Sequence, residues 1–176
     1  EGYTLPSLIC NFKRNSMSKE HTYKATLKWT GDKGEGTKNY KSYERDFTIS
    51  MEDKVDILAS SDPSFRGNKF YHNPEDLLVA SLSGCHMLWF LHLCSINGIT
   101  VVDYTDRALG TMRESEELGG AFTEVVLQPA VVIMDKSQIE RAQDLHKEAN
   151  KMCFIANSCN FTVRHIPTCS ALEKGE

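Results

Sequence analysis

The sequence predicts a single α+β domain, and two observations lead to that class. The length of 176 residues fits one domain. Strand-like and helix-like patterns form separate blocks, in the order β-β-β-α-β-β-α-β, rather than alternating regularly. Residues 1–16 show no periodicity and precede Met17. We therefore expect residues 1–16 to be an extension, either artificial or upstream of the natural start, and residues 17–176 to be the domain. The alternative is that 1–16 form a genuine N-terminal arm.

Three short strands are expected in the first third of the domain. Residues 23–29 alternate apolar and polar side chains, which is typical of a half-buried strand. The glycines of 31–36 indicate a turn. Segments 43–50 and 55–58 then give a second and a third strand, and 59–72 is expected to be a loop.

The next segment carries the clearest helix signals in the chain. Asn73 is a favoured N-cap residue, and Pro74 suits the first helical position. Glu75 and Asp76 favour the positive end of the helix dipole. Gly98 ends the helix after about 24 residues. Nearly all its other side chains are apolar, and a helix that is apolar all round must be surrounded, so we expect a partner subunit to cover part of it.

A hairpin, a second helix and a closing strand complete the expected fold. Residues 99–112 and 121–134 are predicted to be two strands joined by a turn. A capping box at 137–140 opens a helix with one apolar stripe. Residues 153–160 form a connection or short helix, and 161–166 form the last strand.

Composition excludes several functional classes. The net charge is −4 and no basic run exceeds two residues, which argues against nucleic acid as a partner. No apolar stretch reaches 18 uninterrupted residues, so no membrane span is expected. No secretory signal pattern is visible, and we expect a cytoplasmic protein whose cysteines are catalytic, redox-active or buried. The scattered histidines and the lack of Cys-x-x-Cys give no support for a metal site.

Two of the six cysteines have distinctive surroundings. Cys85 lies in the middle of the apolar helix, and Cys153 follows the second, amphipathic helix. Such a pair is suited to peroxide reduction, in which one thiol attacks and the other resolves. The alternative is that both are structural, because free cysteine is among the most buried residue types.

The motifs around these cysteines resemble those of the OsmC/Ohr family of thiol-dependent hydroperoxide reductases. Asn73-Pro74-Glu75-Asp76-Leu77 precedes Cys85, which lies ten residues after Glu75. Cys153 follows 68 residues later, and Arg66 stands just before the Asn-Pro-Glu turn. The resemblance covers residues 21–167, and it implies curved antiparallel sheets wrapped around central helices in an intertwined homodimer.

The resemblance also implies an activity in oxidative stress defence. Organic hydroperoxides would be reduced to alcohols through a sulfenic acid on Cys85 and an intrasubunit Cys85–Cys153 disulfide. Glu75 would steady a catalytic arginine, either Arg66 or, as in the Ohr branch, Arg45. No bound cofactor is implied, because an external dithiol, in some members a lipoylated protein, supplies the electrons.

Some residues leave alternatives open. His86 stands where the best-known branches often carry Phe, so the chain resembles a third subgroup whose substrate and reductant the sequence does not specify. Because neighbours on a helix diverge by about 100°, His86 is expected to pack rather than act as a base beside Cys85. Cys94 faces the opposite way and is expected in the core, Cys159 in the core or a loop, and His92 in an interface. The competing function is a non-catalytic small-molecule or thiol-ligand binding dimer.

Overall fold

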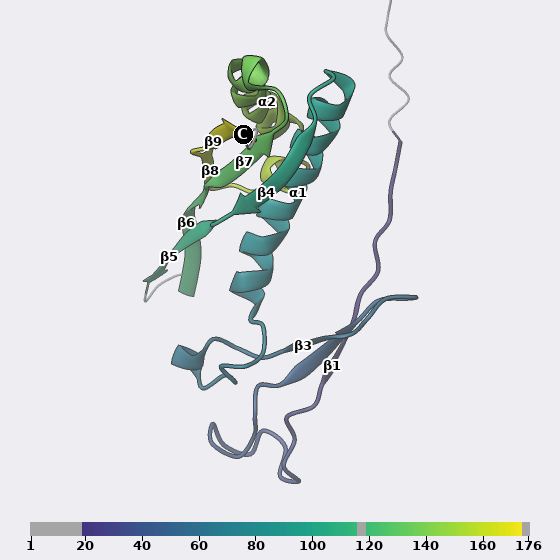
Figure 1. The fold of residues 1–176 in the computed structure, drawn as a ribbon. Helices are drawn as coiled ribbons and strands as arrows, with labels where there is room; N and C mark the ends of the chain where they lie inside the picture. Colours follow the sequence, from purple (N-terminus) through teal and green to yellow (C-terminus); the bar gives the residue numbers. More distant parts are fainter. Residues whose placement is uncertain (1–18, 116–118, 174–176) are drawn as a thin grey trace, which may run out of the picture.

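The computed structural model describes residues 19–115 and 119–173, so the expected extension over 1–16 lies outside the described residues. An N-terminal three-stranded sheet projects from a larger body of two helices and two further sheets (Figure 1). The elements in chain order are β1 (Thr26–Trp29), β2 (Phe47–Ser50), β3 (Ile57–Ala59), a 3-10 turn (Pro63–Phe65), α1 (Pro74–Ile96), β4 (Val101–Asp106), β5 (Leu109–Ser115), β6 (Gly119–Leu127), β7 (Pro129–Ile133), a 3-10 turn (Lys136–Gln138), α2 (Ile139–Met152), a 3-10 turn (Ala156–Ser158), β8 (Thr162–His165) and β9 (Thr168–Ala171).

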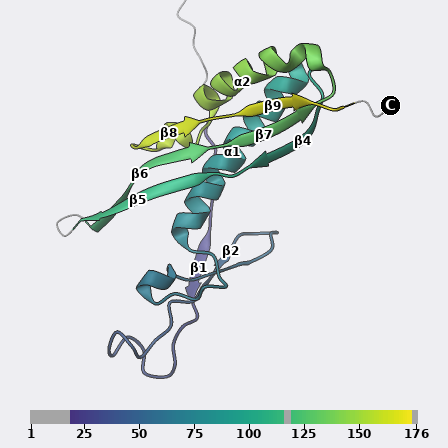
Figure 2. The ribbon, with the colours of Figure 1, turned by 60° about the vertical axis from the view of Figure 1, so that its left-hand side comes forward.

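The N-terminal sheet confirms the three expected strands but leaves them uncovered. β2 pairs antiparallel with both β1 and β3. The expectation of a half-buried first strand is wrong for a single chain, because all four residues of β1 are exposed. Leu27 keeps 63% of its surface exposed and Trp29 keeps 43%. The reason is that this sheet stands away from the helices, as both ribbon views show (Figure 2).

Helix α1 begins and ends where its local signals predict. The Asn73 side chain accepts a hydrogen bond of 2.7 Å from the backbone N–H of Asp76, with Pro74 at the first helical position. At the other end Asn97 caps the helix and Gly98 takes a φ of +69°, a conformation that favours glycine.

One stripe of α1 is buried within the chain. Its buried residues, spaced by four, are Leu82, His86, Phe90 and Cys94. Other apolar residues stay open; Leu88, for example, is 65% exposed. By length and apolarity alone α1 would also suit a membrane span. Its buried stripe packs instead on α2 and the strands, and the hydroxyl of Ser83 donates to Asp106 at 2.6 Å.

The expected two-stranded hairpin is wrong in one respect, since each long strand is broken in two. The halves separate at Arg107–Ala108 and at Gln128, where the backbone N–H of Gln128 donates to the Asp106 carboxylate at 2.6 Å. Pro129 follows and has no N–H to give a continuous ladder. The result is two sheets, β5-β6-β8 and β4-β7-β9, which lie end to end (Figure 2).

The C-terminal part adds a strand that the pattern does not predict. β8 pairs parallel with β6, and β9, just beyond Pro167, pairs parallel with β7. The two sheets of the body are therefore mixed rather than wholly antiparallel. The predicted capping box is also wrong, because Asp135 caps the turn ahead of α2 by accepting from the N–H of Ser137.

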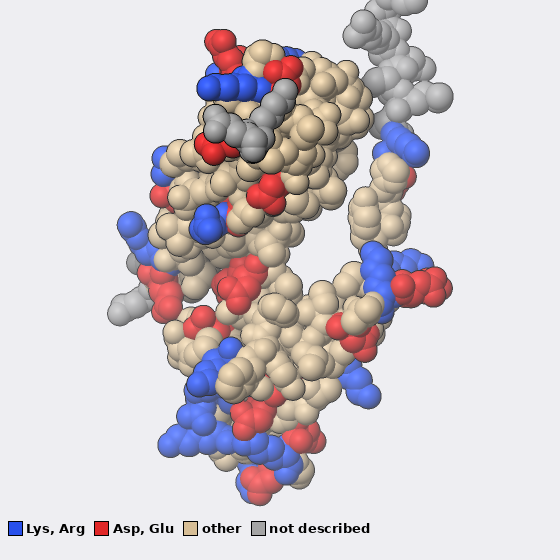
Figure 3. All heavy atoms as spheres, in the orientation of Figure 1, with Lys and Arg blue, Asp and Glu red and all other residues tan. Residues whose placement is uncertain are grey.

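Two core clusters hold the body together. The larger one joins the C-terminal half of α1 to α2 and the β4-β7-β9 sheet, and the smaller one packs Leu82 of α1 on Val125 and Leu127 of β6. On the face shown in Figure 3, charged side chains gather over the N-terminal sheet and its loops and are sparser on the body. The chain thus has a packed body and an N-terminal sheet with little of its own to pack on.

Replacing Asn73 with Ala is expected to lower the free energy of unfolding by about 1 kcal/mol, because the N–H of Asp76 loses its cap. Urea denaturation followed by circular dichroism measures the change. Asn160→Ala is the control, since Asn160 is exposed and its side chain makes no hydrogen bond to the described residues. Equal stability of the two variants would show that the cap contributes nothing measurable.

Candidate active site

The two cysteines singled out by the sequence meet in the structure. Cys85 lies in the middle of α1, and Cys153 is the C-cap residue of α2, the helix that packs on α1. Their thiols are within hydrogen-bonding contact, although 68 residues separate them in the chain. Cys85 is partly exposed, whereas Cys153 is buried with 1% exposure. One thiol is therefore reachable from outside and the other lies directly behind it.

The surroundings of Cys153 favour the protonated form of its thiol. Burial raises the pKa of the Cys153 thiol to about 11, against an opposing backbone hydrogen bond from Ala156. The neighbouring Cys85 adds to the rise through a side-chain hydrogen bond and its charge. Burial thus favours the protonated form of Cys153, and the partly exposed Cys85 is the thiol that a substrate can reach.

The other described cysteines are not part of this pair. Cys94 is buried in the larger core cluster with 1% exposure, as its position on the opposite side of α1 predicts. Burial raises the pKa of its thiol to about 12, and the nearby Cys169 of β9 adds to that rise. Cys159 is partly buried and donates to the carbonyl of Ile155 at 3.3 Å.

An aromatic pair beside the thiols was not predicted as part of the site. Trp89 lies one turn after Cys85 on α1, and Phe154 directly follows Cys153. Their rings meet edge to face with centroids 5.5 Å apart, and His92 lies 5.8 Å from Trp89. Phe154 remains 64% exposed. The spacing of four residues between Cys85 and Trp89 is the signal that could have placed this aromatic wall on the same helix face.

An open cavity of about 830 Å³ runs along α1, and neither Cys85 nor Cys153 lines it. Ser83, Gly84 and Met87, the close neighbours of Cys85, form part of its wall. Five carboxylate side chains also line it, namely Asp62, Glu75, Asp76, Asp106 and Glu114. The cavity is therefore an acidic recess on the face of α1 that carries Asp76, Ala80 and Ser83. Cys85 is rotated by about 140° or more from that face and is not part of the lining.

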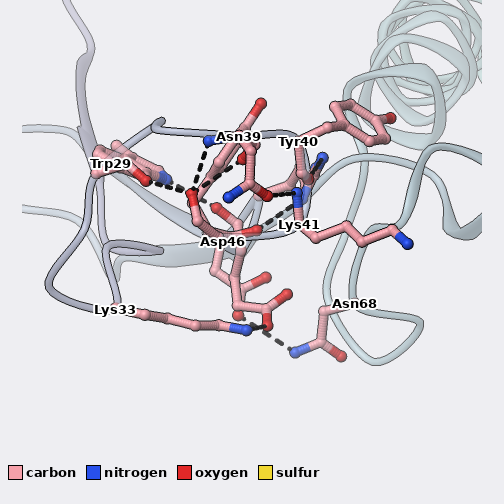
Figure 4. A network of polar contacts seen from close by, with 12 residues as sticks. Trp29, Lys33, Asn39, Tyr40, Lys41, Asp46 and Asn68 are labelled. Carbon is pink, nitrogen blue, oxygen red and sulfur yellow. Dashed lines mark hydrogen bonds and ion pairs between the residues drawn. The ribbon is translucent and has the colours of Figure 1, made fainter.

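The Arg45 side chain is held by contacts within its own loop. Its guanidinium donates to the carbonyls of Tyr43 and Tyr40, at 2.6 and 2.7 Å, and lies over both tyrosine rings at 4.3 and 4.2 Å. Figure 4 shows Tyr40 within the polar network of this region, together with Lys41 and Asp46. These contacts give Arg45 a structural role in the N-terminal part of the chain.

Arg66 is the less restrained of the two candidate arginines. It follows the 3-10 turn in a left-handed conformation with a φ of 67°. Its exposed side chain passes 5.8 Å from the Tyr40 ring and makes no hydrogen bond or ion pair to any described residue. Neither Arg66 nor Arg45 contacts Cys85 or Cys153 in the described chain.

Glu75 is likewise separated from the thiols within one chain. It lies in the first turn of α1, partly buried in the wall of the cavity, and it forms no ion pair with a described residue. Ten residues of helix place it about 15 Å along the axis from Cys85. The single chain thus brings Cys85 and Cys153 together but leaves Glu75, Arg66 and Arg45 apart from them.

No cofactor or metal set emerges from the described residues. No group of three or more His, Cys, Asp or Glu side chains within 19–115 and 119–173 has an arrangement that could hold a metal ion. His86 is buried, as expected for a packing residue, and contacts His146. His92 is exposed in the single chain, so its expected place in an interface stays a prediction.

These features define a two-helix dithiol site on an α+β scaffold. The sequence pattern of the OsmC-like protein family matches residues 66–166, which include α1, α2 and both cysteines. The chain belongs to this family. None of the curated proteins matches it significantly.

Solved structures agree with that assignment. An OsmC-like protein of unknown function from Vibrio cholerae is 30% identical, with a TM-score of 0.77 over 85% of this chain and 100% of that one. An organic hydroperoxide resistance protein from Elizabethkingia anophelis is 23% identical, with a TM-score of 0.64 over 89% and 100% of the two chains. One from Legionella pneumophila is 15% identical, with the same TM-score over 88% and 100%. The last two likenesses concern the fold.

Proposed function

We propose that this protein is a thiol-dependent peroxidase that reduces organic hydroperoxides to alcohols. The observation that carries the proposal is the contact between a partly exposed Cys85 and a buried Cys153 at the α1–α2 junction. Two structural cysteines would not need this asymmetry of exposure. Membership of the OsmC-like family, and a fold shared with organic hydroperoxide resistance proteins, support the same reaction class.

In the first step the Cys85 thiolate attacks the terminal oxygen of the hydroperoxide. The O–O bond breaks, the alkoxide leaves and takes up a proton to become the alcohol, and Cys85 is oxidised to a sulfenic acid. The aromatic wall of Trp89 and Phe154 gives an apolar organic group a surface to lie on. Hydrogen peroxide has no such group, and we expect it to be a poorer substrate.

In the second step the sulfur of Cys153 attacks the sulfenic sulfur of Cys85. The S–S bond forms, the S–O bond breaks and water leaves. The contact between the two thiols makes this condensation short-range. An external dithiol then reduces the Cys85–Cys153 disulfide by thiol–disulfide exchange, and a lipoylated protein is the kind of donor we expect.

We further propose that the active unit is a homodimer. α1 leaves Leu88 and Ile96 65% exposed, and the N-terminal sheet exposes Leu27 and Leu58. A three-stranded sheet with so little covering needs packing from elsewhere. A second copy of the chain would supply this packing, and it would bring an arginine towards Cys85.

The test is peroxide consumption with dihydrolipoamide or dithiothreitol as the donor, comparing cumene hydroperoxide, a fatty-acid hydroperoxide and hydrogen peroxide. Turnover should be fastest with the two organic substrates. A protein that folds with both thiols reduced and consumes none of the three would contradict the proposal. That result would favour the competing function, a non-catalytic dimer that binds a small molecule or thiol ligand.

Replacing Arg66 with Ala is expected to slow sulfenic acid formation on Cys85 by about 10²-fold, while stability changes little. An exposed loop side chain contributes little to folding, but a guanidinium can hydrogen-bond the peroxide oxygens. Stopped-flow consumption of one equivalent of cumene hydroperoxide measures the step, with Lys69→Ala as a control on the same loop. The same loss in Arg45→Ala, with Arg66→Ala unaffected, would assign the role to Arg45.

A further inference from the structure

A pair of histidines is completely buried between the two helices. His86 of α1 and His146 of α2 both have 0% exposure, and their nitrogens Nε2 and Nδ1 are 3.0 Å apart. The two rings are nearly parallel, and Phe90 stacks on His146 with centroids 3.9 Å apart. His165 of β8 lies beside His86 at 5.5 Å.

This pair is not a fully satisfied core contact. The outer nitrogens, Nδ1 of His86 and Nε2 of His146, have no hydrogen-bond partner among the described residues. Two neutral imidazoles share one hydrogen bond, so whichever ring donates it, one N–H and one lone pair stay unpaired in the interior. Apolar side chains of similar size would fill this space without unpaired polar atoms. Stability alone therefore does not account for the pair.

The interior also disfavours a proton on either ring. Burial lowers the pKa of His86 to about 4, and His165 lowers it further while Asp106 opposes the change. Burial lowers the pKa of His146 to about 3, with smaller contributions from His86 and His165. His165 itself has a lowered pKa, through burial and then Lys147. Among the described residues, Asp106 is the group whose charge favours protonation of His86.

The position of the pair connects it to the thiols. His86 directly follows Cys85 in α1, and His146 lies seven residues, or about two turns, before Cys153 in α2. The helix contact that holds the histidines together is the contact that presses the end of α2 against Cys85. Any change that lifts α2 from α1 therefore separates both pairs.

We propose that His86 and His146 are positioning residues for the resolving step: as a neutral pair they hold α2 on α1 with Cys153 against Cys85, and protonation releases α2. The inference rests on the proposed function for its consequence in catalysis. In acid the first step is slower because less thiolate is present, and the sulfenic acid that does form on Cys85 fails to condense with Cys153 because the two sulfurs are no longer in contact. The enzyme would then stay in its sulfenic form instead of completing the cycle.

The sign of the pH dependence follows from the direction of the shifts. Both histidines bind a proton more weakly when packed than when released, so release takes up protons and becomes more favourable as the pH falls. The effect begins near the ordinary pKa of histidine, 6.5, and grows towards pH 4. Two groups that each titrate on release can shift the opening equilibrium by up to about 10²-fold per pH unit.

Hydrogen exchange on the reduced full-length protein tests the release without any peroxide chemistry. Between pH 6.5 and 4.5, and after correction for the intrinsic exchange rate, protection of the α2 amides should fall by at least about 10²-fold. Strand β5 should keep its protection. The double variant His86→Leu/His146→Leu should hold α2 protected at both pH values, and His72→Leu, at an exposed loop position, should behave as wild type.

A second measurement follows the resolving step. One equivalent of cumene hydroperoxide is added with dimedone present, and mass spectrometry gives the ratio of Cys85–Cys153 disulfide to dimedone adduct. The wild-type ratio, divided by that of the double variant, should fall about tenfold or more between pH 6.5 and 4.5. Division by the variant removes the pH dependence of the reagents themselves.

Several results would overturn the inference. Unchanged α2 protection in the wild type would do so without any variant, and so would a loss of protection spread equally over β5, which would indicate global unfolding. If the double variant does not fold, His146→Phe removes one titrating group and should show about half the logarithmic change. A chain that shows the α2 release but consumes no peroxide would instead contradict the proposed function.

Discussion

Replacement of Cys85 by Ser is expected to abolish peroxide reduction with every donor. A serine hydroxyl is not ionised near neutral pH and does not attack the O–O bond, so no sulfenic acid forms. The partly exposed position of Cys85 makes the substitution mild for folding. Peroxide consumption by Cys85→Ser should equal the uncatalysed rate, while its circular dichroism spectrum matches the wild type.

Replacement of Cys153 by Ser is expected to leave one turnover and then stop the reaction. Cys85 still attacks, but its sulfenic acid has no thiol to condense with. A burst of one equivalent of alcohol per chain, followed by a dimedone adduct on Cys85, would show this. The wild type treated with one equivalent of peroxide should give a Cys85–Cys153 disulfide by mass spectrometry.

The pattern of cross-links provides the control. Cys169→Ser should retain full turnover, because Cys169 lies on β9 beside the buried Cys94 and not at the thiol pair. A Cys85–Cys94 linkage in the wild type would overturn the assignment. The two residues lie nine positions apart on one helix, on opposite sides, so their side chains could bridge only if α1 unfolded locally.

The features predicted correctly from the sequence are those set by local chemistry. Asn73, Pro74 and Gly98 define the ends of α1 because a cap, a preset φ and a left-handed turn act within a few residues. The Cys85–Cys153 contact was identified by its resemblance to a family, and the packing of α2 on α1 accounts for it. Periodicity alone would not have joined two residues so far apart.

The features that were missed depend on distant partners. The break in the hairpin depends on a hydrogen bond between Asp106 and Gln128, and β9 exists only because β7 offers a parallel edge. The contact of His86 with His146 spans 60 residues, and nothing near either histidine in the sequence signals it. Strand β1 was expected to be half-buried, but it is exposed in the single chain because its apolar face has no partner within that chain.

The arrangement of charged residues leads to the second large expected effect, an active site shared between two subunits. Within one chain about 15 Å of helix separates Glu75 from Cys85. The exposed Arg66 forms no salt bridge with a described residue, although its charge helps to lower the pKa of Glu44. Glu75 lies in the acidic cavity, whose lining does not include Cys85. An arginine held by the partner subunit's Glu75 would reach the thiol that the arginines of the same chain do not approach.

Mixed dimers of Cys85→Ser and Glu75→Ala chains are therefore expected to regain activity that neither homodimer has in full. In a mixed dimer one site combines the intact Cys85 of one chain with the intact Glu75 of the other, and the second site lacks both. Co-refolded dimers purified through two different tags should show about half the wild-type rate per dimer, as two independent, equivalent sites require. Wild-type chains refolded with Cys85→Ser, which also keep one intact site, set the value for comparison. If the mixed dimer is no more active than the mean of its two parents, each site is built from a single chain, and the arginine must reach Cys85 by a movement within that chain.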